Sequence, residues 1–269
     1  MDDPGRPSGG NVYDLALFEE LPHAGWQINA LPVGGSWPRP DAAALRTLAQ
    51  ALASLPDGAV VLFDGLIGSA APDVLEAEAE RLRLVVLVHL PLRDETGLAP
   101  EVAAALDAGE GRALRTAATV VTVSESTAQR LAAEHGLPLD VVHVAEPGAR
   151  IADAAYGSTD RASELLCVAS ITPRKGHLVL VEALAALAAL ADLPAWRCRL
   201  VGPFGDPAYV ARVRTAVERH GLAERITLDG PLAGAALTAA YAAADVTVLA
   251  TTAENNPLVV RESLTRGFR

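Results

Sequence analysis

The sequence lacks the features of secreted, membrane-spanning and nucleic-acid-binding proteins. Its first ten residues, MDDPGRPSGG, have neither a basic segment nor an apolar run, so we expect no secretory signal peptide. The longest weakly polar stretch, ALAALAALADLPAW, is too short to cross a bilayer, although contact with a membrane surface stays open. Acidic residues outnumber basic ones by 33 to 22, a net charge of −11, which argues against a general nucleic-acid binder. A local site for an anionic small ligand is still allowed.

Cysteine is nearly absent as well. The two cysteines, Cys167 and Cys198, fall in apolar, strand-like runs, LLCVAS and WRCRLV. Two cysteines make no disulfide framework, so we predict buried free thiols and a reducing, cytoplasmic location. No P-loop, G-x-S-x-G, H-E-x-x-H or paired C-x-x-C motif occurs, and no spacing of histidines and acids indicates a metal site.

Short apolar segments alternate with helical patterns along almost the whole chain. This alternation predicts an α/β fold made of two Rossmann-like, doubly wound parallel sheets. A polar stretch at 149–163 divides the chain into domains 1–150 and 151–269. The predicted strands are 26–33, 59–65, 83–90, 118–124, 140–148, 164–170, 196–201, 225–229 and 245–250. The predicted helices are 11–24, 41–55, 71–82, 99–115, 125–136, 176–191, 207–221, 233–243 and 257–266.

Both ends of the pattern are irregular. Residues 1–8 hold no apolar run that could form the first strand, which is central in the usual strand order, so we expect a gap in the first sheet. No strand follows the last helix. We therefore expect a chain truncated at both ends relative to a longer ancestor.

Glu254 and Glu262 are the first candidate site residues. Glu254 lies in the loop at the carboxyl end of a predicted strand, and Glu262 lies on the next helix, which Asn256 and Pro257 would begin. Ligands of open α/β sheets bind at these strand ends, and a carboxylate accepts hydrogen bonds from sugar hydroxyls. The alternative is a surface loop acid and a helix acid that pairs with Arg266.

A second candidate is CVASITPRKGH, where Arg174 and Lys175 precede a helix. Two cations beside free backbone N–H groups form an anion site, and arginine adds a forked contact to phosphate oxygens. Two solvated basic residues on a loop are the alternative reading.

Three weaker candidates also lie at turns or strand ends. Gly10, next to Gly9, would let a ligand approach the first helix, although a flexible terminus explains the pair equally well. His89 ends a very apolar strand, where it could contact a sugar hydroxyl or serve the fold alone. Gly202 ends another strand, either as a site residue or as an ordinary turn glycine.

Together these pieces resemble the retaining, nucleotide-sugar-dependent glycosyltransferases of family 4, which have the GT-B fold. The E-x7-E pair is followed by SLTRG, which is similar to the family's EALARG. Arg174-Lys175-Gly176, SGGNVYD, VHLPL and EPG also look like segments of family members.

The resemblance implies a role for each residue. Arg174 and Lys175 would hold the donor diphosphate, and Glu262 would hold the ribose hydroxyls. Glu254 and His89 would be catalytic: Glu254 would contact the transferred sugar near its reacting carbon, and His89 would contact the sugar or lie behind the reaction face. Gly10 would let the donor or acceptor approach the first helix, and Gly202 would let the donor approach closely. No metal or other cofactor is expected, because cationic side chains and a helix N-terminus supply the positive charge.

The implied reaction moves a hexose from a nucleoside diphosphate sugar to a carbohydrate or glycolipid acceptor, in a site between the two domains. Asn255-Asn256-Pro257 replaces the glycines that many members carry after the first glutamate, which leaves the donor sugar open. Two alternatives remain: an inactive truncated remnant, and a nucleotide-sugar epimerase of the same fold.

Overall fold

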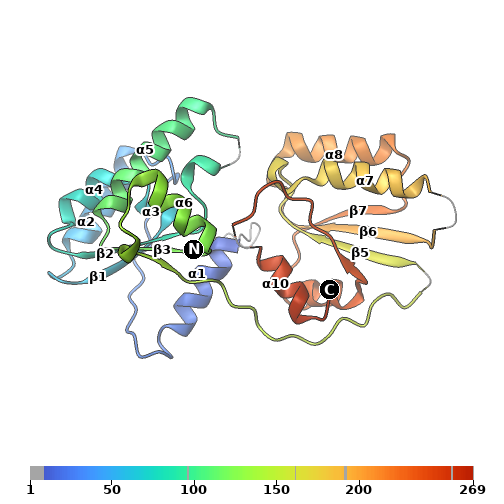
Figure 1. Cartoon of the computed structure of the whole chain (residues 1–269), viewed down its shortest axis with the longest axis horizontal. Helices are drawn as coiled ribbons and strands as arrows, with labels where there is room; N and C mark the ends of the chain where they lie inside the picture. Colours follow the sequence, from blue (N-terminus) through green and yellow to red (C-terminus); the bar gives the residue numbers. More distant parts are fainter. Residues whose placement is uncertain (1–8, 96, 161, 191–192, 256, 269) are drawn as a thin grey trace. The chain divides into compact units, whose positions relative to one another are not determined.

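The computed structural model describes residues 9–95, 97–160, 162–190, 193–255 and 257–268 (Figure 1). The chain forms two compact units. The N-terminal unit is Tyr13–Pro147, and the C-terminal unit runs from Gly148 onward, with the first turn of the first helix grouped with it. Both units are α/β, as the sequence predicts.

The N-terminal unit is built on one parallel sheet in the order β1-β2-β3-β4. Right-handed crossovers between neighbouring parallel strands place the connecting helices on one face (Figure 1). Its elements are α1 (Gly9–Glu20), α2 (Ala42–Ala53), β1 (Val60–Asp64), α3 (Gly65–Gly68), α4 (Pro72–Glu78), β2 (Arg83–Val88), η1 (Leu92–Asp94), α5 (Pro100–Thr116), β3 (Thr119–Thr122), α6 (Glu125–His135), η2 (Leu139–Val141) and β4 (Val142–Val144).

The main core of this unit lies between the sheet and those helices. Phe63, Leu84, Val86 and Val120 supply its strand side, and Leu48, Leu52, Leu75, Leu114 and Leu131 supply its helix side. The opposite face is covered by α1, whose Tyr13 packs with Leu87 and Val123. On that opposite face the edge strand β1 leaves Val60 55% and Leu62 46% exposed.

The predicted strand 26–33 is wrong, because residues 26–34 have no regular secondary structure. An apolar segment becomes a strand only when its backbone finds a ladder partner, and β1 pairs only with β2 within the described residues. Trp26 is accordingly 58% exposed. The described sheet also runs from β1 to β4 without the expected gap. The absence of a first strand was predicted for residues 1–8, which lie outside the described residues.

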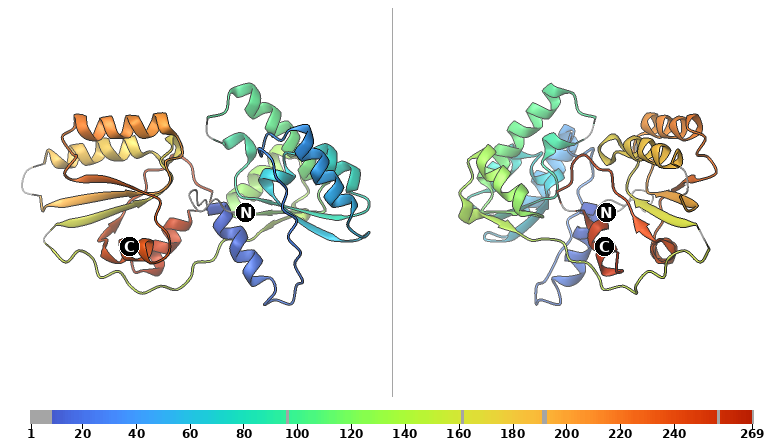
Figure 2. Two further views of the ribbon diagram at one scale, coloured as in Figure 1. Left: turned by 180° about the vertical axis from the view of Figure 1, so that it is seen from behind. Right: turned by 45° about the vertical axis from the view of Figure 1, so that its right-hand side comes forward.

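The C-terminal unit has a parallel sheet in the order β7-β6-β5-β8. Its first strand is internal, and the strand order reverses there, so helices cover both faces (Figures 1 and 2). Its elements are β5 (Ser163–Val168), η3 (Pro173–Lys175), α7 (His177–Ala188), β6 (Trp196–Val201), α8 (Pro207–Arg219), β7 (Ile226–Gly230), α9 (Gly234–Ala243), β8 (Val246–Thr247) and α10 (Leu258–Thr265).

Two apolar clusters fill this unit. One lies under α7 and α8 and includes Val181, Val213 and the two buried free cysteines. The other lies on the α9 side and centres on Tyr241. Burial raises the pKa of Cys167 to about 12 and also raises that of Cys198. The described helices include none with the length and apolar character needed to span a membrane.

Candidate functional site

The loops after β5 and β8 meet where the strand order of the C-terminal sheet reverses. Gly176 joins them: its φ is +66°, and a Cβ there would lie 2.0 Å from the carbonyl oxygen of Ala250. The Thr252 N–H donates to the carbonyl of Arg174 at 2.9 Å, and the Thr251 hydroxyl donates to the same carbonyl at 3.1 Å. A glycine is required at 176 because only the bare backbone fits between the loops.

This contact between the two loops brings Arg174, Lys175 and Glu254 together. The Lys175 ammonium donates directly to Oε1 of Glu254, and their side chains are only 18% and 16% exposed. Arg174 Nη1 donates to the Ala253 carbonyl at 2.9 Å and lies 3.8 Å from the same Oε1. Two cations thus face one carboxylate at the usual ligand position of a doubly wound sheet.

The cations lie just before α7 rather than inside it, in the 3-10 turn η3. Gly176 then leads into α7, whose first residue, His177, is fully buried. Burial, and next the nearby charge of Lys175, lower the pKa of His177 to about 4. This histidine is therefore neutral at physiological pH, and the positive charge of the loop comes from Arg174 and Lys175.

Glu262 lies on α10 and accepts a hydrogen bond from the Tyr241 hydroxyl at 2.7 Å. Arg266 donates to the backbone carbonyl of Glu262 at 2.8 Å, and its guanidinium lies 4.3 Å from the centre of the Tyr241 ring. Burial, followed by the charge of Glu262, raises the pKa of Tyr241. Tyr241 is a site neighbour that sequence reasoning missed. Asn256, the predicted cap of this helix, lies outside the described residues.

The two glycine candidates occupy different settings. At Gly202, φ is +153° and a Cβ would lie 2.1 Å from the Ala169 carbonyl oxygen, so close packing of two strand ends explains this glycine. Gly10 lies within α1, which begins at Gly9 rather than after the glycine pair.

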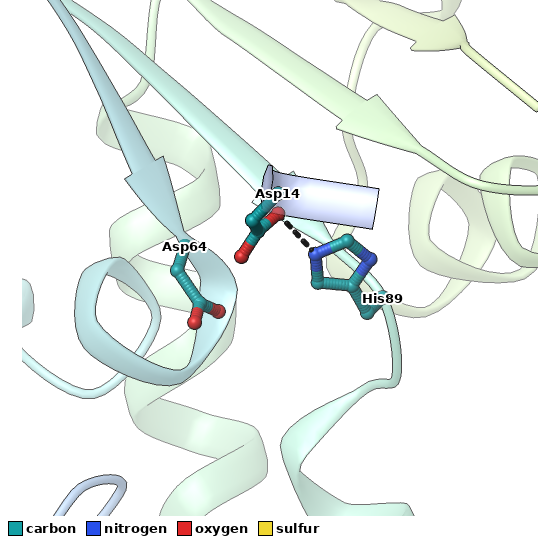
Figure 3. A group of neighbouring side chains, drawn as sticks. All are labelled: Asp14, Asp64 and His89. Atoms are coloured by element: carbon teal, nitrogen blue, oxygen red, sulfur yellow. Dashed lines mark hydrogen bonds and ion pairs between the residues drawn. The ribbon is translucent and has the colours of Figure 1, made fainter. Parts of the chain in front are cut away.

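In the N-terminal unit, His89 follows β2 at the carboxyl end of the sheet. Its Nε2 lies 2.7 Å from Oδ1 of Asp14 on α1 (Figure 3). The Tyr13 ring meets the His89 ring edge to face, with centroids 5.3 Å apart. Asp64, at the end of β1, lies beside the pair (Figure 3).

Asp14 and Asp64 are site residues that sequence reasoning missed. Oδ1 of Asp64 accepts the Leu66 N–H at 2.9 Å and so begins α3. Burial raises the pKa of Asp64, and the charge of Asp14 raises it further. Asp64 is the last residue of an apolar strand, which was a usable signal, whereas nothing in the helix pattern marked Asp14.

Asp14, Asp64 and His89 offer ligand atoms within 4.8 Å of one another, a donor set that could hold a divalent cation. A second such group, Asp107, Glu134 and His135, has its carboxylates paired with Arg93. The Arg93 guanidinium thus supplies, at these carboxylates, the positive charge that a metal ion would otherwise supply.

A buried acid supports the loop that follows His89. Glu110 on α5 is fully buried, and its Oε2 accepts the Leu92 N–H of η1 at 3.0 Å. Burial raises the pKa of Glu110 to about 7. The loop that follows His89 is therefore hydrogen-bonded to a buried carboxyl group whose pKa is raised to about 7.

Comparison with known families agrees with this arrangement. Residues 7–148 match the glycosyl transferase 4-like domain, and residues 150–268 match the glycosyl transferases group 1. The chain belongs to the family 4 glycosyltransferases of the GT-B fold. A search of the curated proteins finds no relative by sequence.

Solved glycosyltransferases share the fold of this chain. HepE from Anabaena, solved with UDP and glucose, is 19% identical with a TM-score of 0.71, over 99% of this chain and 77% of HepE. A sucrose-phosphate synthase from Thermosynechococcus elongatus is 19% identical with a TM-score of 0.73, over 99% of this chain and 77% of the synthase. The lipopolysaccharide outer core galactosyltransferase WaaB is 14% identical with a TM-score of 0.59, over 83% of this chain and 58% of WaaB.

Proposed function

We propose that this glycosyltransferase moves a hexose from a nucleoside diphosphate sugar to an acceptor hydroxyl, with retention of configuration at the anomeric carbon. One observation carries the proposal: Arg174, Lys175 and Glu254 converge where the strand order of the C-terminal sheet reverses. Cations suit a diphosphate there, and a carboxylate suits the hydroxyls of the sugar attached to it.

The C-terminal unit would bind the donor. Arg174 and Lys175 would contact the diphosphate and stabilise the negative charge that grows as the nucleotide leaves. Glu254 would contact the transferred sugar, and Glu262 would accept hydrogen bonds from the ribose hydroxyls. These cations replace the charge that a metal would supply, so no metal or other cofactor is included in the reaction.

The Lys175–Glu254 ion pair has a mechanistic consequence. Lys175 must exchange its contact with Glu254 for a diphosphate oxygen when the donor binds. The exchange releases Glu254 to contact the sugar, so donor binding would prepare both groups at once. Gly10 would let the donor or acceptor approach α1. Gly202, where packing against the Ala169 carbonyl already requires a glycine, would lie beside the donor.

The N-terminal unit would bind the acceptor, a carbohydrate or glycolipid, with His89 contacting the transferred sugar. A glycolipid acceptor would bring the enzyme to a membrane surface. HepE was solved with UDP and glucose, which makes uridine diphosphate the first nucleotide to test. Two buried free thiols fit a reducing compartment such as the cytoplasm.

The first test is calorimetric titration of the chain with UDP and with GDP, after confirming a cooperative thermal transition. We expect micromolar binding of one nucleotide and its loss in Lys175→Ala. A cooperatively folded chain that binds neither nucleotide would contradict the donor assignment. A chain without a transition would support an inactive remnant.

Transfer itself is tested with the matching nucleotide sugar and a panel of sugar and glycolipid acceptors. NMR of the product then gives the anomeric configuration. Conversion of the donor without any acceptor would favour an epimerase. An inverted product would overturn the proposed retention.

A further inference from the structure

Helix α1 brings two neighbouring side chains to the carboxyl end of β2. Tyr13 is buried, and its hydroxyl donates to the Ala145 carbonyl at 2.9 Å, which fixes α1 to the chain after β4. The next residue, Asp14, then lies beside His89. The helix is thus held in the position from which its carboxylate reaches the imidazole.

The contact between Asp14 and His89 defines which ring nitrogen carries a hydrogen. A carboxylate accepts hydrogen bonds and donates none, so Nε2 of His89 must be the donor across the 2.7 Å separation. In the neutral ring, Nδ1 is then the acceptor atom. The edge-to-face contact with Tyr13, at an interplanar angle of 74°, restrains the plane of the same ring.

We propose that Asp14 is a positioning residue, which holds His89 in the Nε2–H form and fixes its ring plane for glycosyl transfer. The proposal rests on the function proposed above, in which His89 contacts the sugar. In the Nε2–H form, Nδ1 is the acceptor nitrogen of the ring, whereas in the other tautomer it would be a donor. The carboxylate would therefore decide how His89 contacts the substrate.

Asp64 provides a comparison within the same cluster. It lies beside Asp14 and His89 (Figure 3). Its Oδ1, however, accepts the Leu66 N–H. Its carboxylate contributes negative charge without the hydrogen bond that orients the ring. A second pair supplies a control outside the site: His135 Nε2 and Asp107 Oδ1 are 3.8 Å apart, beyond hydrogen-bond distance.

The contact between Asp14 and His89 is tested first by NMR of the ring nitrogens of His89 in the full chain, with the resonances assigned through His89→Gln. We expect a wild-type spectrum typical of the Nε2–H tautomer and a mixture of tautomers in Asp14→Ala. Asp14→Asn, whose amide oxygen also accepts, should restore most of the wild-type pattern. Asp64→Asn and Asp107→Asn should keep the Nε2–H pattern. Unchanged nitrogen shifts in Asp14→Ala would overturn the proposal.

Transfer kinetics provide the second test. Asp14→Ala and His89→Ala should each lower kcat at least 10-fold, and the double variant should be no worse than the more damaging single one. Asp14→Asn should recover part of kcat. Losses that multiply in the double variant, with thermal stability unchanged, would contradict the proposal. A wild-type chain without transfer would refute the proposed function, and the ring-nitrogen spectra would still decide whether Asp14 orients His89.

Discussion

Lys175 and Glu254 lie 79 positions apart in sequence and form a direct ion pair in the C-terminal unit. We propose that each of them binds part of the donor. In the free protein they bind each other instead. We therefore expect opposite effects on nucleotide binding from the two substitutions. Glu254→Gln should bind nucleoside diphosphate up to about fivefold more tightly, since a partly exposed pair contributes at most about 1 kcal/mol. Lys175→Ala should abolish binding.

Both variants should lose transfer at least 100-fold, for different reasons. Glu254→Gln loses the carboxylate that contacts the sugar, while Lys175→Ala loses the charge on the leaving diphosphate. Titration calorimetry and initial rates measured side by side check the pattern. Weaker nucleotide binding in Glu254→Gln would contradict competition between the ion pair and the diphosphate.

Tyr241 is expected to support Glu262 in the same unit. Tyr241→Phe removes only the hydroxyl that donates to Glu262 at 2.7 Å. We expect the KM for the donor to rise three- to tenfold with little change in kcat, because ribose contacts are made in the ground state and transition state alike. Tyr209→Phe, which removes the hydroxyl that accepts the Leu178 N–H, is a control of equal size. An unchanged KM in Tyr241→Phe would exclude this support.

Substitutions at Gly176 and Gly221 can distinguish two costs of replacing a glycine: the cost of its backbone conformation and the cost of steric overlap. Their φ angles are +66° and +67°, but a Cβ at 176 meets the Ala250 carbonyl at 2.0 Å and a Cβ at 221 meets nothing within 4 Å. Gly221→Ala should cost about 1–2 kcal/mol from backbone conformation alone. Gly176→Ala should cost at least about 2 kcal/mol more and should abolish nucleotide binding. Chemical denaturation measures both, and equal losses would show that the loops move apart easily.

Glu110 predicts a dependence of stability on pH. Burial raises its pKa from 4.5 to about 7, so the folded state prefers the protonated acid. The stability from this group is fully present below about pH 4.5 and is lost as the pH rises through about 7, a change of roughly 3 kcal/mol at most. Glu110→Gln should remove this pH dependence and should be more stable than wild type at pH 8.

Urea denaturation between pH 5 and pH 8 checks this expectation. Glu101→Gln, an exposed acid on the same helix, should follow the wild-type curve within about 0.5 kcal/mol. A Glu110→Gln variant that destabilises the protein at pH 8 would mean that the ionised carboxylate is needed for the Leu92 contact.

A chelator should leave transfer unchanged, because Arg174 and Lys175 supply the positive charge at the diphosphate. Initial rates with and without EDTA measure this. A loss of rate that Mn²⁺ restores would contradict the expectation. If Asp64→Asn then abolished the restoration, the metal would be assigned to the group formed by Asp14, Asp64 and His89.

Much of the fold follows from the periodicity of the sequence. The local pattern of apolar residues predicts buried strands such as β2 and β6 and amphipathic helices such as α8. Their predicted bounds lie within two residues of the observed ones. The segment 26–33 was misread because its composition is that of a strand. Strand formation depends on a ladder partner, which composition does not reveal.

The candidate site divides in the same way. Arg174, Lys175, Glu254 and His89 lie at strand ends, where the topology of parallel sheets concentrates ligand contacts. Asp14 and Tyr241 lie on helices, and each reaches the site through a contact with a residue distant in sequence. Glu110 resembles any polar residue of an amphipathic helix until the fold places it under the loop that follows His89.

The contact between Gly176 and Ala250 also limits how this enzyme can be re-engineered. Residues 172–176 and 250–254 share the Arg174 carbonyl and one point of backbone contact. Replacing either segment alone with that of another transferase would leave the Arg174 carbonyl unsatisfied or close the space that the glycine keeps open. Chimeras intended to change donor preference should therefore exchange the two segments as a single cassette.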